Sequence, residues 1–329
     1  MKCAFFAWLC LALQAQSPFR IDFPEKKELS QEDYLFVQQE LRKINLRPLL
    51  HELYPEGKDY AEFNDFLGRS TRGARQILID PEKKRYPVKG LQKIGNGSTK
   101  NCVVCAVPFS GGYPEYIPSI AQGLAKQGFN GHFLYYIGGF PNPTGKEIQY
   151  AAVPYSFKIF AMVEAFQLGF QNVLWIDSSA YPVRDINPLF DEIESTGALL
   201  CNTPLSDSHW KYILPSTRRE LKALTQVDVL DPGTQYIVMV LFGLNAKSAK
   251  TEQLIQQYYQ LVERGTPFLS CFPEEWVLTA LLGQPPFASW RRLRKLGRVK
   301  LAPIDADHSI EQMEKAAGEG AYFYHRRGR

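Results

Sequence analysis

From about residue 101 onward, short apolar runs alternate with segments in which apolar residues recur at helical spacing. The first run, CVVCAVPF over residues 102–109, is of strand type and ends at a Ser-Gly-Gly turn. An amphipathic segment over residues 116–127 closes at Gly128, and HFLYYIGG over residues 132–139 is the next apolar run. These patterns predict a strand, a helix with a glycine C-cap, and a second strand.

The same alternation continues towards the carboxyl terminus. Residues 157–168 have helical spacing and end at Gly169, and the apolar run NVLWID over residues 172–177 predicts the next strand. Further strands are predicted at 197–202 and 236–244, and further helices from Asn187-Pro188, at 247–263 and at 272–283. Alternating strands and helices predict a doubly wound α/β sheet, in which ligands bind beyond the carboxyl ends of the strands. Asp177 stands at one of those ends.

Residues 17–99 have a different character, because they are charged and their periodicity is helical. Ser30 followed by Asp33 predicts a helix N-cap. Apolar residues then recur at helical spacing, at Tyr34, Val37, Leu41 and Ile44. We expect a helical N-terminal extension over residues 17–99 that packs on a main domain formed by residues 100–329.

The first sixteen residues predict a targeting segment. Lys2 precedes an apolar run over residues 4–13, which has the length of a secretory signal core and is too short to cross a bilayer comfortably. We expect a signal peptide over residues 1–16 and an exported protein, periplasmic, extracellular or lumenal. A short uncleaved anchor is the alternative, and it would associate the protein with a membrane.

The charge balance gives little support to a nucleic-acid partner. The 329 residues carry a formal net charge of only +4, although basic residues cluster over residues 291–300 and 325–329. A basic cluster serves phosphates, anionic lipid or nucleic acid, or it is simply a solvated helix face. Nucleic-acid binding through residues 291–300 would predict an affinity that depends strongly on salt.

The Cys102-x-x-Cys105 spacing is usually associated with redox or metal chemistry. Here it lies within a predicted strand, where residues three apart point to opposite faces of the sheet. One metal ion therefore cannot take both thiolates without a bulge, and the pair is interpreted as core.

Asp177 has three interpretations on residue chemistry alone. It caps the turn that follows the strand, it pairs with a nearby base, or its carboxylate binds a ligand. Its context supplies a preceding helix that carries Lys158 and, at its start, Tyr155. The motif itself is Leu174-Trp175-Ile176-Asp177, and apolar positions follow at Val183, Ile186, Leu189 and Phe190.

This stretch, from about residue 154 to 202, resembles nucleotide-sugar-dependent glycosyltransferases of the GT-A fold. The resemblance implies a Rossmann-like α/β domain with a mixed, mainly parallel central sheet. It also implies a nucleotide-sugar donor at the strand ends, with Tyr113 stacking on the base. The donor-binding residues implied are Val107, Pro108, Phe109, Tyr113, Tyr155, Lys158, Asp177, Ser179 and Arg184.

One signature element of that family is altered here. The family's D-x-D motif places its last aspartate on Mn²⁺ or Mg²⁺, and Ser179 occupies that position in this chain. A hydroxyl is a weaker ligand for a hard cation than a carboxylate. The resemblance then implies that Asp177 holds a ribose hydroxyl, or a metal ion through one carboxylate only. It also implies that His325 completes a metal or phosphate site, and the alternative for His325 is a tail histidine on an edge strand. In the absence of a full metal site, Lys158, Arg184 or the C-terminal arginines would neutralise the leaving group.

The resemblance also implies a catalytic carboxylate at the start of a late helix, where this chain carries Glu274 and Glu275. The alternative is that both simply interact with the helix dipole. Asp207 and His209 are second choices, on a loop after a strand end.

Together these features predict a glycosyltransferase that moves a sugar from a nucleotide-diphosphate donor to a glycan, lipid or protein acceptor. The alternative is an exported carbohydrate-binding or interaction protein on a GT-A scaffold that has lost catalysis, which Ser179 would also fit.

Overall fold

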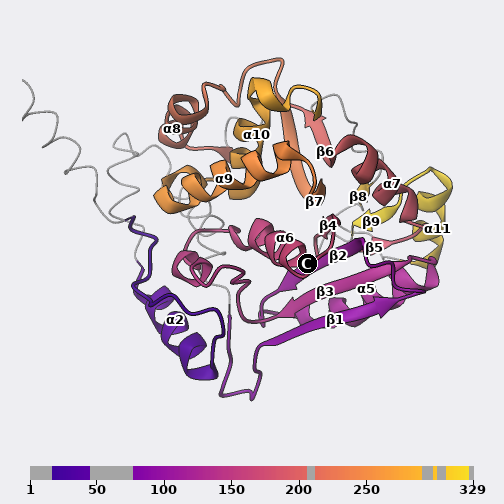
Figure 1. Cartoon of the computed structure of the whole chain (residues 1–329), viewed down its shortest axis with the longest axis horizontal. Helices are drawn as coiled ribbons and strands as arrows, with labels where there is room; N and C mark the ends of the chain where they lie inside the picture. Colours follow the sequence, from indigo (N-terminus) through magenta and orange to yellow (C-terminus); the bar gives the residue numbers. More distant parts are fainter. Residues whose placement is uncertain (1–16, 45–76, 206–211, 291–298, 302–308, 326–329) are drawn as a thin grey trace, which may run out of the picture.

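The computed structural model describes residues 17–44, 77–205, 212–290, 299–301 and 309–325. Its centre is a six-stranded sheet in the order β1-β3-β2-β4-β7-β6 (Figure 1). These strands are β1 Val88–Ile94, β2 Asn101–Val107, β3 Gly131–Ile137, β4 Asn172–Ile176, β6 Ala198–Pro204 and β7 Gln235–Asn245. A second sheet has the order β5-β9-β8, with β5 Ala180–Pro182, β8 Val299–Leu301 and β9 Phe323–His325.

Eight α-helices are described along the same residues. They are α2 Gln31–Lys43, α5 Tyr113–Lys126, α6 Phe157–Gln167, α7 Asn187–Thr196, α8 Pro215–Thr225, α9 Ala249–Arg264, α10 Pro273–Gly283 and α11 Ile310–Gly318. Three short 3₁₀ turns complete the elements, at η1 Glu147–Tyr150, η3 Thr266–Phe268 and η4 Pro285–Phe287.

The central sheet is mixed and mainly parallel, as expected. Strand β2 is parallel to both β3 and β4, whereas β1 is antiparallel to β3 and β7 is antiparallel to β4 and β6. Strands β2, β3, β4 and β6 therefore run in one direction, and their carboxyl ends share one edge of the sheet. The predicted α/β class is confirmed, and Asp177 follows β4 at this edge.

Helices cover both faces of the sheet and explain its continuous apolar strand sequences. Helices α6, α8, α9 and α10 contribute to the core on one face, and α5 and α7 to the core on the other. Along β4, Val173 and Trp175 enter the first core, while Leu174 and Ile176 enter the second. Strands buried on both faces lose the usual apolar–polar alternation.

Strand β2 shows the same division at its cysteines. Cys102 packs in the core beside α6, and Cys105 packs in the core beside α5. Both thiols are buried and free. The prediction that the two cysteines point to opposite faces is confirmed.

The amino-terminal residues are tied to the main domain. Ser30 and Asp33 form a capping box at the start of α2, and Val37 on that helix is buried. Phe19 and Ile21, from the segment before α2, are also buried in the core beside α6.

Strand β1 lies on the amino-terminal side of the expected boundary at residue 100, so the sheet begins earlier than the sequence pattern suggested. The reason is its edge position. β1 has a neighbour on one side only, and its sequence VKGLQKI is mostly exposed. An edge strand of this kind has no apolar run that would reveal it.

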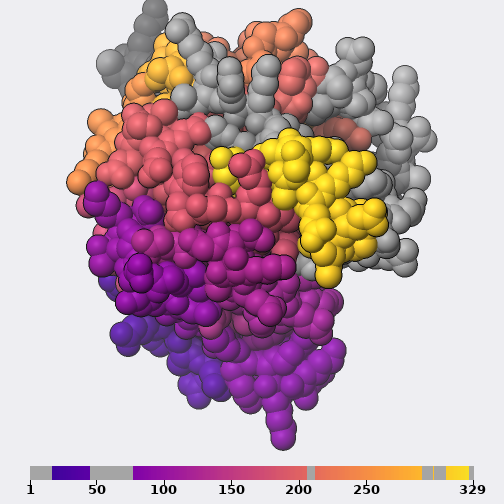
Figure 2. All heavy atoms as spheres, turned by 90° about the vertical axis from the view of Figure 1, so that its right-hand side faces the viewer, coloured from indigo at the N-terminus to yellow at the C-terminus, as the bar shows by residue number. Residues whose placement is uncertain are grey.

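The small sheet brings the carboxyl-terminal segment against the residues that follow Asp177. β9 pairs antiparallel with β5, placing His325 opposite Ala180, and β8 pairs parallel with β9. In Figure 2 this yellow segment lies on the surface beside the magenta and red parts of the chain.

No helix among the described residues is long and apolar enough to cross a bilayer. The expected signal or anchor at residues 1–16 lies outside the described residues, as do Asp207, His209 and most of the basic clusters at 291–300 and 325–329.

Candidate functional site

The Asp177 carboxylate is held by two donors, one from helix α6 and one from strand β4. Lys158 Nζ on α6 is 2.9 Å from Asp177 Oδ1, and Trp175 Nε1 donates a hydrogen bond of 3.1 Å to the same oxygen. Trp175 and Asp177 are two residues apart along an extended strand, so their side chains project to the same face. The carboxylate is fixed by a base and an indole, and its side chain remains 28% exposed.

Lys158 is buried between two carboxylates. Its ammonium lies 2.9 Å from Asp177 Oδ1 and 2.6 Å from Glu274 Oε1, and its side chain is only 6% exposed. Burial by itself lowers the pKa of Lys158, but the carboxylates of Asp177 and Glu274 overcome that effect and raise the pKa above its ordinary value. The residue therefore provides a permanent positive charge inside the site.

The two glutamates at the start of α10 take different directions. Glu274 faces Lys158, and burial raises its pKa although the Lys158 ammonium opposes the rise. Glu275 instead accepts hydrogen bonds from the Tyr236 hydroxyl at 2.5 Å and from the Met239 amide at 2.9 Å. Of the two predicted catalytic residues, the structure brings only Glu274 to the Asp177–Lys158 pair.

The buried Glu275 carboxyl is expected to make the unfolding free energy depend on pH. Burial and the Glu274 carboxylate raise the pKa of Glu275 to about 8, from an ordinary 4.5. The folded state therefore binds this proton more tightly than the unfolded state, and the contribution to stability is lost as the pH rises through 8. Glu275→Gln stays neutral and keeps an oxygen for the Met239 amide.

We therefore expect the unfolding free energy of Glu275→Gln, relative to that of wild type, to be higher at pH 8.5 than at pH 5 by on the order of 1–3 kcal/mol. Urea unfolding at both values measures it. The exposed Glu252→Gln on α9 is the control, with an unchanged profile. A Glu275→Gln profile parallel to wild type would contradict the assignment.

Two aromatic rings, those of Tyr155 and Trp175, also lie near the Lys158 ammonium. The Tyr155 ring centroid lies 5.4 Å from Lys158 Nζ, and the Trp175 ring lies 5.6 Å from the same atom. Tyr155 has φ of +59°, a left-handed conformation that is costly for a large side chain and that often marks functional sites. Burial raises the pKa of its hydroxyl to about 12.

Ser179 and His325 meet across the two sheets. Ser179 Oγ lies 2.7 Å from His325 Nε2, although 146 positions separate them in the chain. The antiparallel pairing of β5 with β9 produces this contact. The structure thus brings together the position of the altered D-x-D residue and the C-terminal histidine that the resemblance associates with it.

This donor set does not fit a hard divalent cation. Mn²⁺ and Mg²⁺ take oxygen ligands, preferably several carboxylates. Here Asp177 Oδ1 already receives Lys158 and Trp175, and the neutral Ser179 hydroxyl is paired with His325. A single carboxylate that is shared with an ammonium supplies too little negative charge for such an ion.

The remaining predicted donor residues lie in different surroundings. Val107 and Phe109 are buried, and Phe109 lies under the guanidinium of Arg85 at 5.3 Å. Tyr113 begins α5 and is 45% exposed, so its ring is available to a ligand. Arg184 stacks on the Tyr322 ring at 5.0 Å. Pro108 is half-buried next to Phe109.

Trp175 is the site residue that the sequence interpretation did not identify as one. Its position two residues before Asp177 on one strand was the available signal, because period-two spacing puts both side chains on one face.

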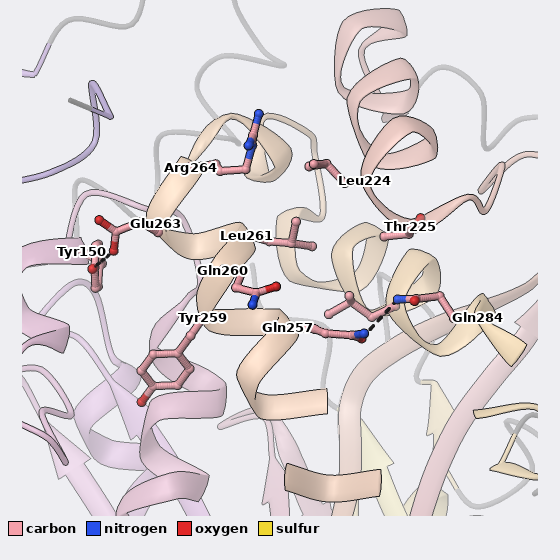
Figure 3. Close-up of a pocket in the computed structure, with 11 residues that line it drawn as sticks. Tyr150, Leu224, Thr225, Gln257, Tyr259, Gln260, Leu261, Glu263, Arg264 and Gln284 are labelled. Carbon is pink, nitrogen blue, oxygen red and sulfur yellow. Dashed lines mark hydrogen bonds between the residues drawn. The ribbon is translucent and has the colours of Figure 1, made fainter. Parts of the chain in front are cut away.

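A separate groove of about 640 Å³ lies between α8, α9 and α10 (Figure 3). Its polar groups are largely paired, since Gln284 donates to Gln257 at 3.1 Å and Glu263 accepts from Arg20 at 2.9 Å. Gln284 follows the carboxyl end of α10, whereas Glu274 is in the first turn of that helix. Ten residues of helix span about 15 Å, so this groove is separate from the Lys158 site.

No family model and no curated protein sequence matches this chain. Among solved structures, the apo form of the bifunctional glycosyltransferase WbbM is 10% identical, with a TM-score of 0.40, over 72% of this chain and 47% of WbbM. This chain thus spans about half of WbbM. Mouse xyloside xylosyltransferase 1 in its apo form is 16% identical with a TM-score of 0.33, over 65% of this chain and 72% of that one.

The galactosyltransferase LgtC, solved with donor and acceptor sugar analogues, is 12% identical with a TM-score of 0.37, over 69% of this chain and 87% of LgtC. These three structural neighbours are all glycosyltransferases. At such identities and TM-scores the similarity does not establish an activity for this chain.

Proposed function

We propose that this protein is a glycosyltransferase that binds a nucleotide-diphosphate sugar at the edge formed by the carboxyl ends of β2 and β4. The observation that carries the proposal is the buried Lys158 ammonium, which Asp177 and Glu274 share at that edge. A buried, charged triad is costly to maintain, and such groups gather where a sheet binds ligands.

Each residue has a distinct part in the proposed reaction. Asp177, the most exposed of the three, accepts a hydroxyl of the donor, while Lys158 provides positive charge for the departing diphosphate. The bond from the anomeric carbon to the diphosphate oxygen breaks, and the diphosphate leaves with the electron pair. The acceptor hydroxyl oxygen bonds to that carbon and gives its proton to Glu274, whose raised pKa suits a proton acceptor.

Neutralisation of the leaving group in this scheme relies on side-chain cations instead of a divalent ion. Among the residues that the structure describes, Lys158 provides positive charge inside the site. Arg326 and Arg327, which directly follow His325 in the sequence, belong to the C-terminal arginines predicted for this role and lie outside the described residues.

Thermal unfolding with UDP-, GDP-, CMP- and ADP-linked sugars tests the donor site. A donor at a hundred times its dissociation constant is expected to add about 2.7 kcal/mol to the unfolding free energy. The shift is expected for one nucleotide class, without Mn²⁺, and to disappear in Asp177→Asn. Asp191→Asn, on an exposed position of α7, is the matched control and keeps the shift. No shift with any donor in well-folded protein would contradict the proposal.

Ser179 favours one alternative, an exported carbohydrate-binding protein that uses the same scaffold without catalysis. That alternative predicts saccharide binding with neither a nucleotide-sugar shift nor nucleotide release. The donor panel therefore separates the two functions.

A further inference from the structure

Two aromatic side chains lie together at the start of α10, the helix that also carries Glu274. Phe272 immediately precedes α10 and stands two residues before Glu274, which contacts Lys158. Its ring meets Tyr212 at a centroid separation of 5.7 Å with the planes nearly perpendicular. We call Phe272 and Tyr212 the aromatic pair.

The backbone holds the aromatic pair at the same sheet edge as Asp177. Strand β6 runs in the direction of β4 and ends at Pro204, so the chain that leads on to Tyr212 starts from that edge. The Cys271 amide donates to the Tyr212 carbonyl at 3.0 Å, and Ile213 forms a bridge with Ser270. Two segments that are distant in the sequence are thus fastened together beside Glu274.

Phe272 is exposed where burial would be expected. Its exposed fraction is 39%, whereas Trp276, one turn further along α10, is fully buried. A large apolar ring that remains in water loses stabilisation that burial would give. The exposure is understandable if a ligand covers the ring during function.

We infer that the acceptor of the proposed transfer is a saccharide and that one of its sugar rings stacks on Phe272. A pyranose has an apolar face of C–H bonds and a polar edge of hydroxyls. An exposed aromatic ring at a sheet edge that also carries carboxylates matches both, because the ring takes the C–H face and carboxylates accept hydrogen bonds from the hydroxyls. A lipid acceptor would need a wider apolar surface than this one aromatic pair provides.

This inference rests on the proposed function and names the acceptor class of the same site. Phe272 acts as a specificity-determining residue, and Glu274 remains the proton acceptor. On the donor side, the Tyr155 ring lies beside the Lys158 ammonium, and the exposed Tyr113 begins α5, which follows β2. Donor and acceptor therefore have separate aromatic contacts.

The test compares Phe272→Ala with two exposed aromatic controls. Steady-state nucleotide release is measured with the active donor and neutral di- and trisaccharides of glucose, galactose, xylose and N-acetylglucosamine as acceptors. Phe272→Ala is expected to raise the acceptor KM at least tenfold, with kcat and donor affinity within twofold of wild type, and Phe272→Trp to retain a low KM. Tyr113→Ala is expected to weaken the donor only. Phe36→Ala, 43% exposed on α2, changes neither.

Saturation-transfer NMR with the same saccharides gives a readout that does not need turnover. Binding to wild type that Phe272→Ala loses would support the saccharide site even if no donor were ever transferred, so the two proposals fail independently. An acceptor KM and saccharide binding unchanged by Phe272→Ala would overturn the inference. So would transfer to a peptide or lipid acceptor while no saccharide binds.

Discussion

Replacing Lys158 with methionine is expected to lower the unfolding free energy by about 3–5 kcal/mol at pH 7, the cost of removing one partner of a buried ion pair. The methionine fills much of the lysine's volume, so the loss arises from charge. Glu274, with its side chain 5% exposed, would then face Asp177 without a cation between them. Urea unfolding measures the change.

Two further measurements separate this charge effect from lost packing. The double variant Lys158→Met/Glu274→Gln removes the ammonium together with the buried carboxylate, and we expect it to recover most of the lost stability. At pH 5 the single variant should recover partly as well, because Glu274 is protonated more readily than an ordinary glutamate.

The half-exposed Lys89, which pairs with Glu164, is the control for an ordinary surface ion pair. Lys89→Met is expected to cost less than 1 kcal/mol. If Lys158→Met costs no more than Lys89→Met, or if the double variant is no more stable than the single one, the triad does not have the energetic role assigned to it.

The strands that the sequence predicted most clearly are those with the same apolar environment on both faces. β2 and β4 are covered on both faces, so the residues after their first asparagines, Asn101 and Asn172, are apolar and the runs are conspicuous. β1 was missed because its residues face water and its single neighbour leaves no hydrophobic pattern. Among the strands, a sequence pattern therefore reveals most readily those that bury both faces, whereas helices are revealed by burying one face at helical spacing.

The sequence predicted individual site residues better than it predicted which of them contact one another. Asp177 at a strand end and Lys158 near the start of the preceding helix follow from local pattern. The choice between Glu274 and Glu275 does not, because adjacent helical residues differ by about 100° in direction and only packing decides which one faces Lys158. The meeting of Ser179 with His325 depends on β5–β9 pairing, which no local signal specifies.

A carboxylate at position 179 is expected to create a binding site for Mn²⁺. We expect Ser179→Asp to bind Mn²⁺, so that Mn²⁺ at a hundred times its dissociation constant adds about 2.7 kcal/mol to the unfolding free energy of the variant and nothing to wild type. The Ser179 hydroxyl lies 2.7 Å from His325 Nε2. A carboxylate there would join the imidazole and the half-buried Asp177, which gives two carboxylates and one nitrogen for the ion.

Two control variants make the metal prediction specific. Ser179→Asn has nearly the same volume without the charge, and Ser179→Asp/His325→Ala keeps the charge without the imidazole; both should lose most of the Mn²⁺ effect. Isothermal titration calorimetry gives the affinities directly. If wild type binds Mn²⁺ as tightly as Ser179→Asp, the hydroxyl at 179 does not limit metal binding, and the assignment of leaving-group charge to side-chain cations alone is wrong. If only Ser179→Asp binds, one residue decides whether this sheet edge uses a metal ion or the Lys158 ammonium.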